Sequence, residues 1–195
     1  LDAVTYPDPA VIASVQESFV PLRLQLGDPH VRGLNIVWLP TVVILDHRGR
    51  EHGRCVNAAP PDDFLDVLAL AEAHARLKDA RTESHARAEH VLEAALARRP
   101  HGPLHPELLY WLAIAAYFRG HHDGEARDRA WSELRRRYPD SAWAHRVPEY
   151  LIDDSIEPDS RRIWQLTTGG IPSEARNLGA ADTPPPVIQD PAFTE

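Results

Sequence analysis

Chemistry in this chain would have to start from a single cysteine, Cys55, and from eleven histidines. A thiol becomes a good nucleophile when a helix N-terminus or a nearby cation lowers its pKa. Cys55 falls in a predicted strand, where the side chain of its neighbour Arg54 points to the opposite face. We therefore predict that Cys55 packs as a small buried side chain and has no redox role.

The histidines do not follow a metal-binding pattern. The densest cluster is His121-His122-Asp123, but adjacent side chains on a turn rarely bind one ion, and the spacing of His85 and His90 is poor for sharing a helix face. The chain also lacks the Gly-x-Ser-x-Gly, P-loop and dinucleotide-binding motifs. We therefore expect no metal site, no cofactor and no catalytic residue in these 195 residues.

The charge pattern argues against two classes of partner. The net charge is −8, whereas a surface for nucleic acid or anionic lipid needs concentrated lysine and arginine. The short basic run 135–137 would wrap around a helix and be solvated. No stretch approaches the roughly 18 apolar residues that a membrane span needs. A single cysteine fits a reducing compartment, so we expect a cytoplasmic protein.

The segment best suited to position a site lies around Pro40. Leu39-Pro40-Thr41 opens a run of apolar and β-branched residues that closes on Asp46-His47-Arg48-Gly49. This pattern is typical of a strand that begins at a proline and ends in a hairpin turn, and the second strand would follow over residues 50–57.

Three further elements complete this region. Asp8 and Pro9 predict the start of a helix, and the alternation over residues 20–26 predicts a strand with one buried face. Pro60-Pro61 precedes residues with apolar side chains at helical spacing, which predicts another helix. The order of these elements predicts an α/β domain over residues 1–77.

The order of elements and the Leu-Pro-Thr strand start resemble the second half of a thioredoxin fold. The resemblance implies that the Leu39–Pro40 bond is cis, and that Trp38, Leu39, Pro40 and Thr41 border a groove for a substrate peptide. An exposed backbone that starts a strand can pair with an extended peptide, and a neighbouring aromatic side chain adds contact area. The alternative is that Trp38 caps the core.

Thioredoxins act through Cys-x-x-Cys, which this sequence does not contain. Residues 5–22 are similar to the segment that follows the dithiol in members whose helix ends in a Phe-Val-Pro strand. The resemblance therefore implies a Cys-x-x-Cys and a first strand just upstream of Leu1. The absence of methionine agrees with the expectation that the native chain starts earlier. The fold expected for residues 1–77 is therefore a truncated thioredoxin-like sheet with flanking helices.

Residues 78–150 have a different composition and predict an all-α region of short helices, each apolar on one side. Tyr110-Trp111, Tyr117, Gly120 and Tyr138-Pro139 resemble elements of a tetratricopeptide repeat. The resemblance implies helical hairpins that bind a protein, with Tyr110, Trp111 and Tyr117 as candidate contacts. The alternative for the aromatic residues is packing between helices. Two helix pairs are marginal alone, so we expect them to dock on the α/β domain.

Residues 151–195 contain six prolines and no sustained apolar face, which predicts an extended tail. The alternative is a docking arm anchored by Trp164 and Phe193.

Two functions follow from the sequence. The first is a thioredoxin-like thiol-disulfide oxidoreductase whose dithiol lies upstream of Leu1 and whose helical repeats bind a partner. The second is a non-catalytic adaptor or chaperone-like protein that binds a protein or peptide through the Pro40 groove and the helices. The sequence leaves the oligomeric state open.

Overall fold

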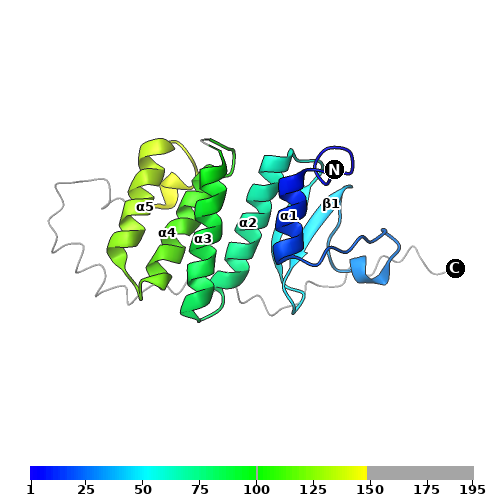
Figure 1. The fold of residues 1–195 in the computed structure, drawn as a ribbon, viewed down its shortest axis with the longest axis horizontal. Coiled ribbons are helices and arrows are strands. Elements are labelled where there is room, and N and C mark those ends of the chain that lie inside the picture. Colours follow the sequence, from blue (N-terminus) through cyan, green and yellow to red (C-terminus); the bar gives the residue numbers. More distant parts are fainter. Residues whose placement is uncertain (100, 149–195) are drawn as a thin grey trace, which may run out of the picture. The chain divides into compact units, whose positions relative to one another are not determined.

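The computed structural model describes residues 1–99 and 101–148, so the tail predicted over residues 151–195 lies outside the described residues. The fold is mixed α/β and mostly helical, with a two-stranded antiparallel sheet and five helices among these residues (Figure 1). In chain order the elements are α1 (Pro9–Ser18), the short 3-10 helix η1 (Pro29–Val31), β1 (Thr41–Leu45), β2 (Glu51–Val56), α2 (Pro61–Leu77), α3 (Thr82–Arg98), α4 (His105–Arg119), α5 (Gly124–Arg137) and the 3-10 helix η2 (Ala144–Arg146).

Helix α1 begins where the sequence predicts. The Asp8 carboxylate accepts hydrogen bonds from the backbone N–H groups of Ala10 and Val11 at 2.9 and 3.2 Å. Pro9 occupies the first turn, where its missing N–H costs no helical hydrogen bond. The side chain of Val11 is buried and fixes α1 against the α/β core.

The predicted strand over residues 20–26 is wrong for the described part of the chain. This segment joins no sheet, and the side chains of Val20, Leu22 and Leu26 are 95%, 76% and 61% exposed. A strand forms only where a neighbour satisfies its backbone and covers its apolar face, and neither is present here. Apolar and other residues do alternate along this segment, but no strand among the described residues pairs with it.

The hairpin around Pro40 forms as predicted. The Leu39–Pro40 peptide bond is cis, and β1 pairs with β2 from Thr41↔Val56 to Leu45↔Glu51, with a bulge near Ile44 and Leu45. Gly49 has a φ of +75° and donates its N–H to the Asp46 carbonyl at 2.9 Å. That backbone conformation is easy for glycine, so Gly49 allows the chain to reverse.

One face of the hairpin packs on α2. The backbone of Gly53 lies so near this helix that a Cβ on Gly53 would be 2.7 Å from the Cβ of Ala71. The core between these elements consists of the buried side chains of Val11, Ile44, Cys55, Phe64, Leu65, Leu68 and Ala71.

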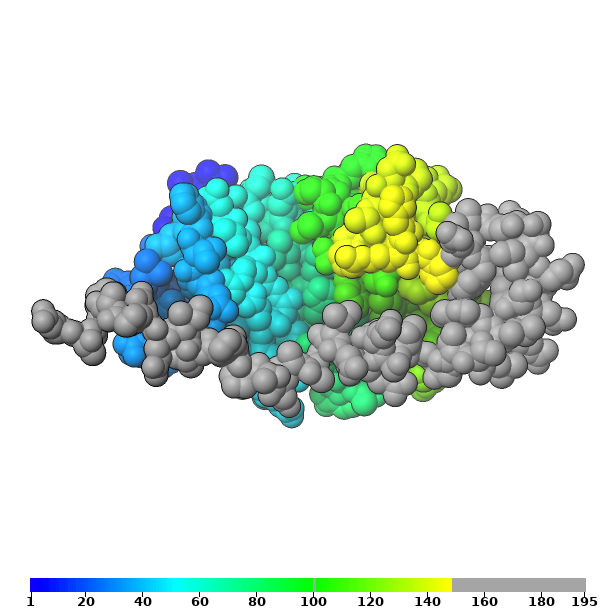
Figure 2. Space-filling model, turned by 180° about the vertical axis from the view of Figure 1, so that it is seen from behind, coloured from blue at the N-terminus to red at the C-terminus, as the bar shows by residue number. Residues whose placement is uncertain are grey.

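Helix α2 also belongs to the helical region. Its residues Ala69, Leu70 and Ala73 share a second core with α3 and α4, and a third core joins α4, α5 and the segment around η2. The helices therefore pack directly against the α/β region, as we expected (Figure 1). Figure 2 shows the same continuity from behind, where the cyan residues adjoin the green ones.

An ion-pair network ties α3 to α2. Asp66 on α2 is fully buried, and its two carboxylate oxygens accept hydrogen bonds from Arg98 and Arg99 at 2.5 and 2.6 Å. Arg99 also reaches Asp63 at 2.7 Å. The network fixes the C-terminal end of α3 against the first turns of α2. No helix among the described residues has the length and apolar character that crossing a membrane would require.

Candidate functional site

The candidate site is the loop that leads into β1, residues 33–40, with its exposed apolar side chains. Gly33 has a φ of +88° and Asn35 a φ of +49°, so the loop bends sharply before it reaches the strand. Val37, Trp38 and Leu39 then project into solvent, and Trp38 is 62% exposed. An indole this exposed does not cap the core formed by the residues that the structure describes.

The backbone of this loop is held in place although its side chains are exposed. The Thr41 hydroxyl donates to the Trp38 carbonyl at 2.6 Å, and Asn57 donates its backbone N–H to the Pro40 carbonyl at 2.7 Å. Arg54 on β2 donates to the Leu34 carbonyl at 2.7 Å. These bonds give the loop a fixed shape before any ligand arrives, which reduces the entropy cost of binding.

Arg54 has a role that could not be predicted from the sequence. Its guanidinium also pairs with Glu51 at 2.6 Å, and this hydrogen bond raises the pKa of Arg54. Arg54 therefore links β2 to a loop about twenty residues earlier in the chain. No local pattern could have revealed the link, because the carbonyls that it binds belong to ordinary loop residues.

Further apolar side chains are exposed close to the same hairpin and the N-terminal residues. Val56 on β2, Tyr6 and Val4 are all exposed, and the Tyr6 ring lies edge-on to Phe64 with 6.0 Å between centroids. Arg23 pairs with Asp2 at 3.2 Å, which places the unpaired segment 20–26 beside the N-terminal residues. The exposed apolar residues of segment 20–26 therefore belong to the same part of the molecule.

Cys55 is buried, as the strand pattern predicted. Burial raises the pKa of its thiol, and the charge of Asp63 raises it further. Its nearest hydrogen-bond acceptor is the Asn57 carbonyl, 3.9 Å from Sγ. A buried thiol with a raised pKa is a poor nucleophile, so Cys55 acts in packing.

The candidate residues of the helical region do not form one site. Tyr110 stacks on Trp131 with a centroid distance of 5.7 Å and lies tilted against Trp143 at 5.1 Å. Trp111 lies edge-on to His74 at 4.5 Å. Tyr117 instead contacts the guanidinium of Arg127, whose Cζ is 5.3 Å from the ring centroid.

The three candidate residues are partly buried, so packing between helices accounts for much of their surface. Tyr110, Trp111 and Trp143 together still present an aromatic surface, and Arg146 covers the Trp143 ring at 4.2 Å. Among residues 1–99 and 101–148 no group of three His, Cys, Asp or Glu side chains could hold a metal ion.

Comparison of the chain with protein-family models, with curated proteins and with solved structures finds no match. Among the described residues the chain is a mixed α/β protein in which an exposed apolar loop precedes a hairpin and helices pack on the other side of α2.

Proposed function

We propose that this chain is the substrate-binding part of a thioredoxin-like thiol-disulfide oxidoreductase whose Cys-x-x-Cys precedes Leu1. In the reaction, one thiolate of the dithiol attacks a sulfur of the substrate disulfide, and the released substrate sulfur leaves as a thiolate. The second thiolate then attacks the mixed disulfide. The dithiol ends as a disulfide and the substrate as two thiols. Such chemistry fits a reducing compartment such as the cytoplasm.

The observation that carries the proposal is the arrangement around Pro40. Pro40 directly precedes β1, and Val37, Trp38 and Leu39 are exposed immediately before it. Within residues 1–99 and 101–148 no backbone–backbone hydrogen bond engages residues 36–39. Apart from the Trp38 carbonyl, which accepts from the Thr41 hydroxyl, their N–H and C=O groups are therefore available to an extended peptide, while Trp38 supplies apolar contact area.

The unpaired segment 20–26 supports a further strand in the complete protein. Its exposed side chains alternate as they would on a strand, and β1 has a strand neighbour on one edge only among the described residues. One additional strand beside these elements would cover Val20 and Leu22 and complete a sheet with helices on its faces.

For the helical region, we propose two tetratricopeptide-like hairpins, α2 with α3 and α4 with α5, that bind a protein partner. In this arrangement α2 serves both regions, since its residues contribute to both cores. The aromatic surface formed by Tyr110, Trp111 and Trp143 is the proposed contact.

The second candidate is an adaptor or chaperone-like module that binds peptides without redox chemistry. The exposed Trp38 and Leu39 favour it, because these side chains can bind a peptide whether or not a dithiol is present.

The experiment that separates the two candidates uses the protein extended by its native upstream residues. If these residues contain Cys-x-x-Cys, we expect reduction of insulin disulfides with turnover, lost when both cysteines are changed to serine. If they contain no cysteine pair, or the pair gives no turnover, the oxidoreductase is excluded. Binding of an extended peptide that depends on Trp38 would then support the adaptor.

A further inference from the structure

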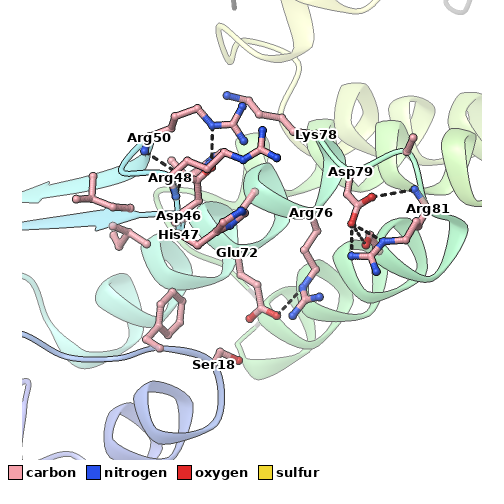
Figure 3. Close-up of a pocket in the computed structure, with 18 residues that line it drawn as sticks. Ser18, Asp46, His47, Arg48, Arg50, Glu72, Arg76, Lys78, Asp79 and Arg81 are labelled. Atoms are coloured by element: carbon pink, nitrogen blue, oxygen red, sulfur yellow. Dashed lines mark hydrogen bonds and ion pairs between the residues drawn. The ribbon is translucent and has the colours of Figure 1, made fainter.

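A pocket of about 660 Å³ lies at the end of the hairpin opposite to Pro40 (Figure 3). It is formed by the end of α1, the β1–β2 turn, the C-terminal part of α2 and the start of α3. Because β1 runs from Thr41, the residue after Pro40, to this turn, the pocket is separate from the candidate peptide site. A volume of this size falls within the usual range of small-molecule sites, about 300–1,000 Å³.

The pocket combines apolar walls with a charged rim. Phe19, Ile44 and Ala71, which belong to the core or pack against it, contribute to the lining together with Leu45 and Ala75. Arg48, Arg50 and Lys78 are exposed, and Figure 3 shows their cationic groups directed to the same side of the pocket.

The carboxylates of the lining are already engaged by donors of the protein. Asp46 accepts hydrogen bonds from the backbone N–H groups of Arg48 and Arg50 at 2.8 and 3.0 Å and from the Arg50 side chain at 2.8 Å. Burial alone would raise the pKa of Asp46, but these bonds and one from His52 lower it well below its usual value.

The other two carboxylates are engaged in the same way. Glu72 pairs with Arg76 at 3.1 Å and with Arg87 at 3.2 Å, and Asp79 pairs with Arg81 at 2.6 Å. The hydrogen bonds from Arg81 and Ser84 lower the pKa of Asp79. These anions are therefore not free to neutralise another cation.

Two cations of the lining remain without such a partner. The pocket is lined by five arginine or lysine side chains and by three aspartate or glutamate side chains. No carboxylate in residues 1–99 or 101–148 forms an ion pair with Arg48 or Lys78. This local positive excess stands out in a chain whose net charge is −8.

We infer that this pocket binds a small organic phosphate, with Arg48 and Lys78 holding the phosphate group and the apolar part of the lining holding the organic part. A phosphate monoester carries close to two negative charges at neutral pH, which matches the two unpaired cations. Arginine and lysine are the side chains that usually bind this group. The mixed lining favours an organic phosphate over the free ion, since burial of the organic part adds to the charge contacts.

The test is titration of the chain with phenyl phosphate at low salt, followed by calorimetry and by NMR shifts of residues around the pocket. Inorganic phosphate and benzoate serve as comparison probes, because one lacks the organic part and the other lacks the second charge. The variant R48Q/K78Q removes the two cations, and R129Q removes an exposed arginine on α5 as a matched control.

We expect saturable binding of phenyl phosphate that is tighter than that of either comparison probe. We expect R48Q/K78Q to weaken it by about tenfold or more, the equivalent of about 1.4 kcal/mol, while R129Q binds like the parent chain. No saturable binding, or equal binding by R48Q/K78Q and the parent, would overturn the inference. Equal binding of phenyl phosphate and inorganic phosphate would exclude the apolar part of the site. Circular dichroism of each variant verifies its fold.

Discussion

The close approach of β2 to α2 can be tested by exchanging a methyl group between the two elements. In the parent chain, a Cβ on Gly53 would be 2.7 Å from the Cβ of Ala71. The proposed variants are Gly53→Ala, Ala71→Gly and the double variant. Gly53 does not have a positive φ, so alanine at this position meets a steric conflict and no backbone strain.

The size of each effect follows from this geometry. The two methyl groups would have to separate by roughly 1 Å to reach ordinary contact, and overpacking of this kind costs about 1–3 kcal/mol. Ala71→Gly lies within α2 and removes a buried methyl group, so it should cost about 1 kcal/mol through helix propensity and about 0.8 kcal/mol more through lost burial. The double variant removes the conflict, so its loss should be smaller than the sum of the two single losses by about 1 kcal/mol or more.

The measurement is urea unfolding followed by far-UV circular dichroism, with the free energy of unfolding compared across the four proteins. Gly27→Ala is the control, since nothing lies within 4 Å of a Cβ on Gly27, and a change within about 0.5 kcal/mol is expected there. If Gly53→Ala is as mild as the control, or if the two single effects add, the packing of β2 on α2 described above is wrong.

Three further predictions concern the ion-pair network, the buried histidines and the peptide site. Asp66→Asn should lower the free energy of unfolding by about 3 kcal/mol, because it leaves Arg98 and Arg99 without their buried anion. Glu133→Gln, which removes one partner of an exposed ion pair, should cost less than about 1 kcal/mol. Equal losses for the two variants in urea unfolding would contradict the network.

Burial lowers the pKa of His74 and of His105 in the folded state, so the unfolded chain binds protons first as the pH falls. The free energy of unfolding should therefore be largest above the ordinary histidine pKa of about 6.5 and should fall as the pH drops below it. Urea unfolding from pH 8 to pH 5 tests this prediction, and a flat profile would refute it. Trp38→Ala should weaken binding of an extended peptide by about tenfold at unchanged unfolding free energy, because the indole is mostly exposed; a loss of stability instead would show a packing role.

Several features could be predicted from the sequence because neighbouring residues determine them. Asp8 and Pro9 start α1 by capping and by a fixed φ, and the apolar spacing of α2 to α5 follows the helical period. Pro40 begins β1 because its missing N–H is tolerated at a strand start, and Gly49 turns the hairpin. The burial of Cys55 followed from the same strand pattern.

Other features depend on partners distant in the sequence, so only the tertiary structure decided them. Residues 20–26 alternate as a strand does, yet they join no sheet in the described part of the chain, because pairing requires a neighbour that propensity does not provide. The fixing of the loop before Pro40 by Arg54, and the pocket beside Arg48 and Lys78, likewise bring together residues from separate elements. Periodicity determines which face of an element is apolar; which element covers that face is decided only when the chain has packed.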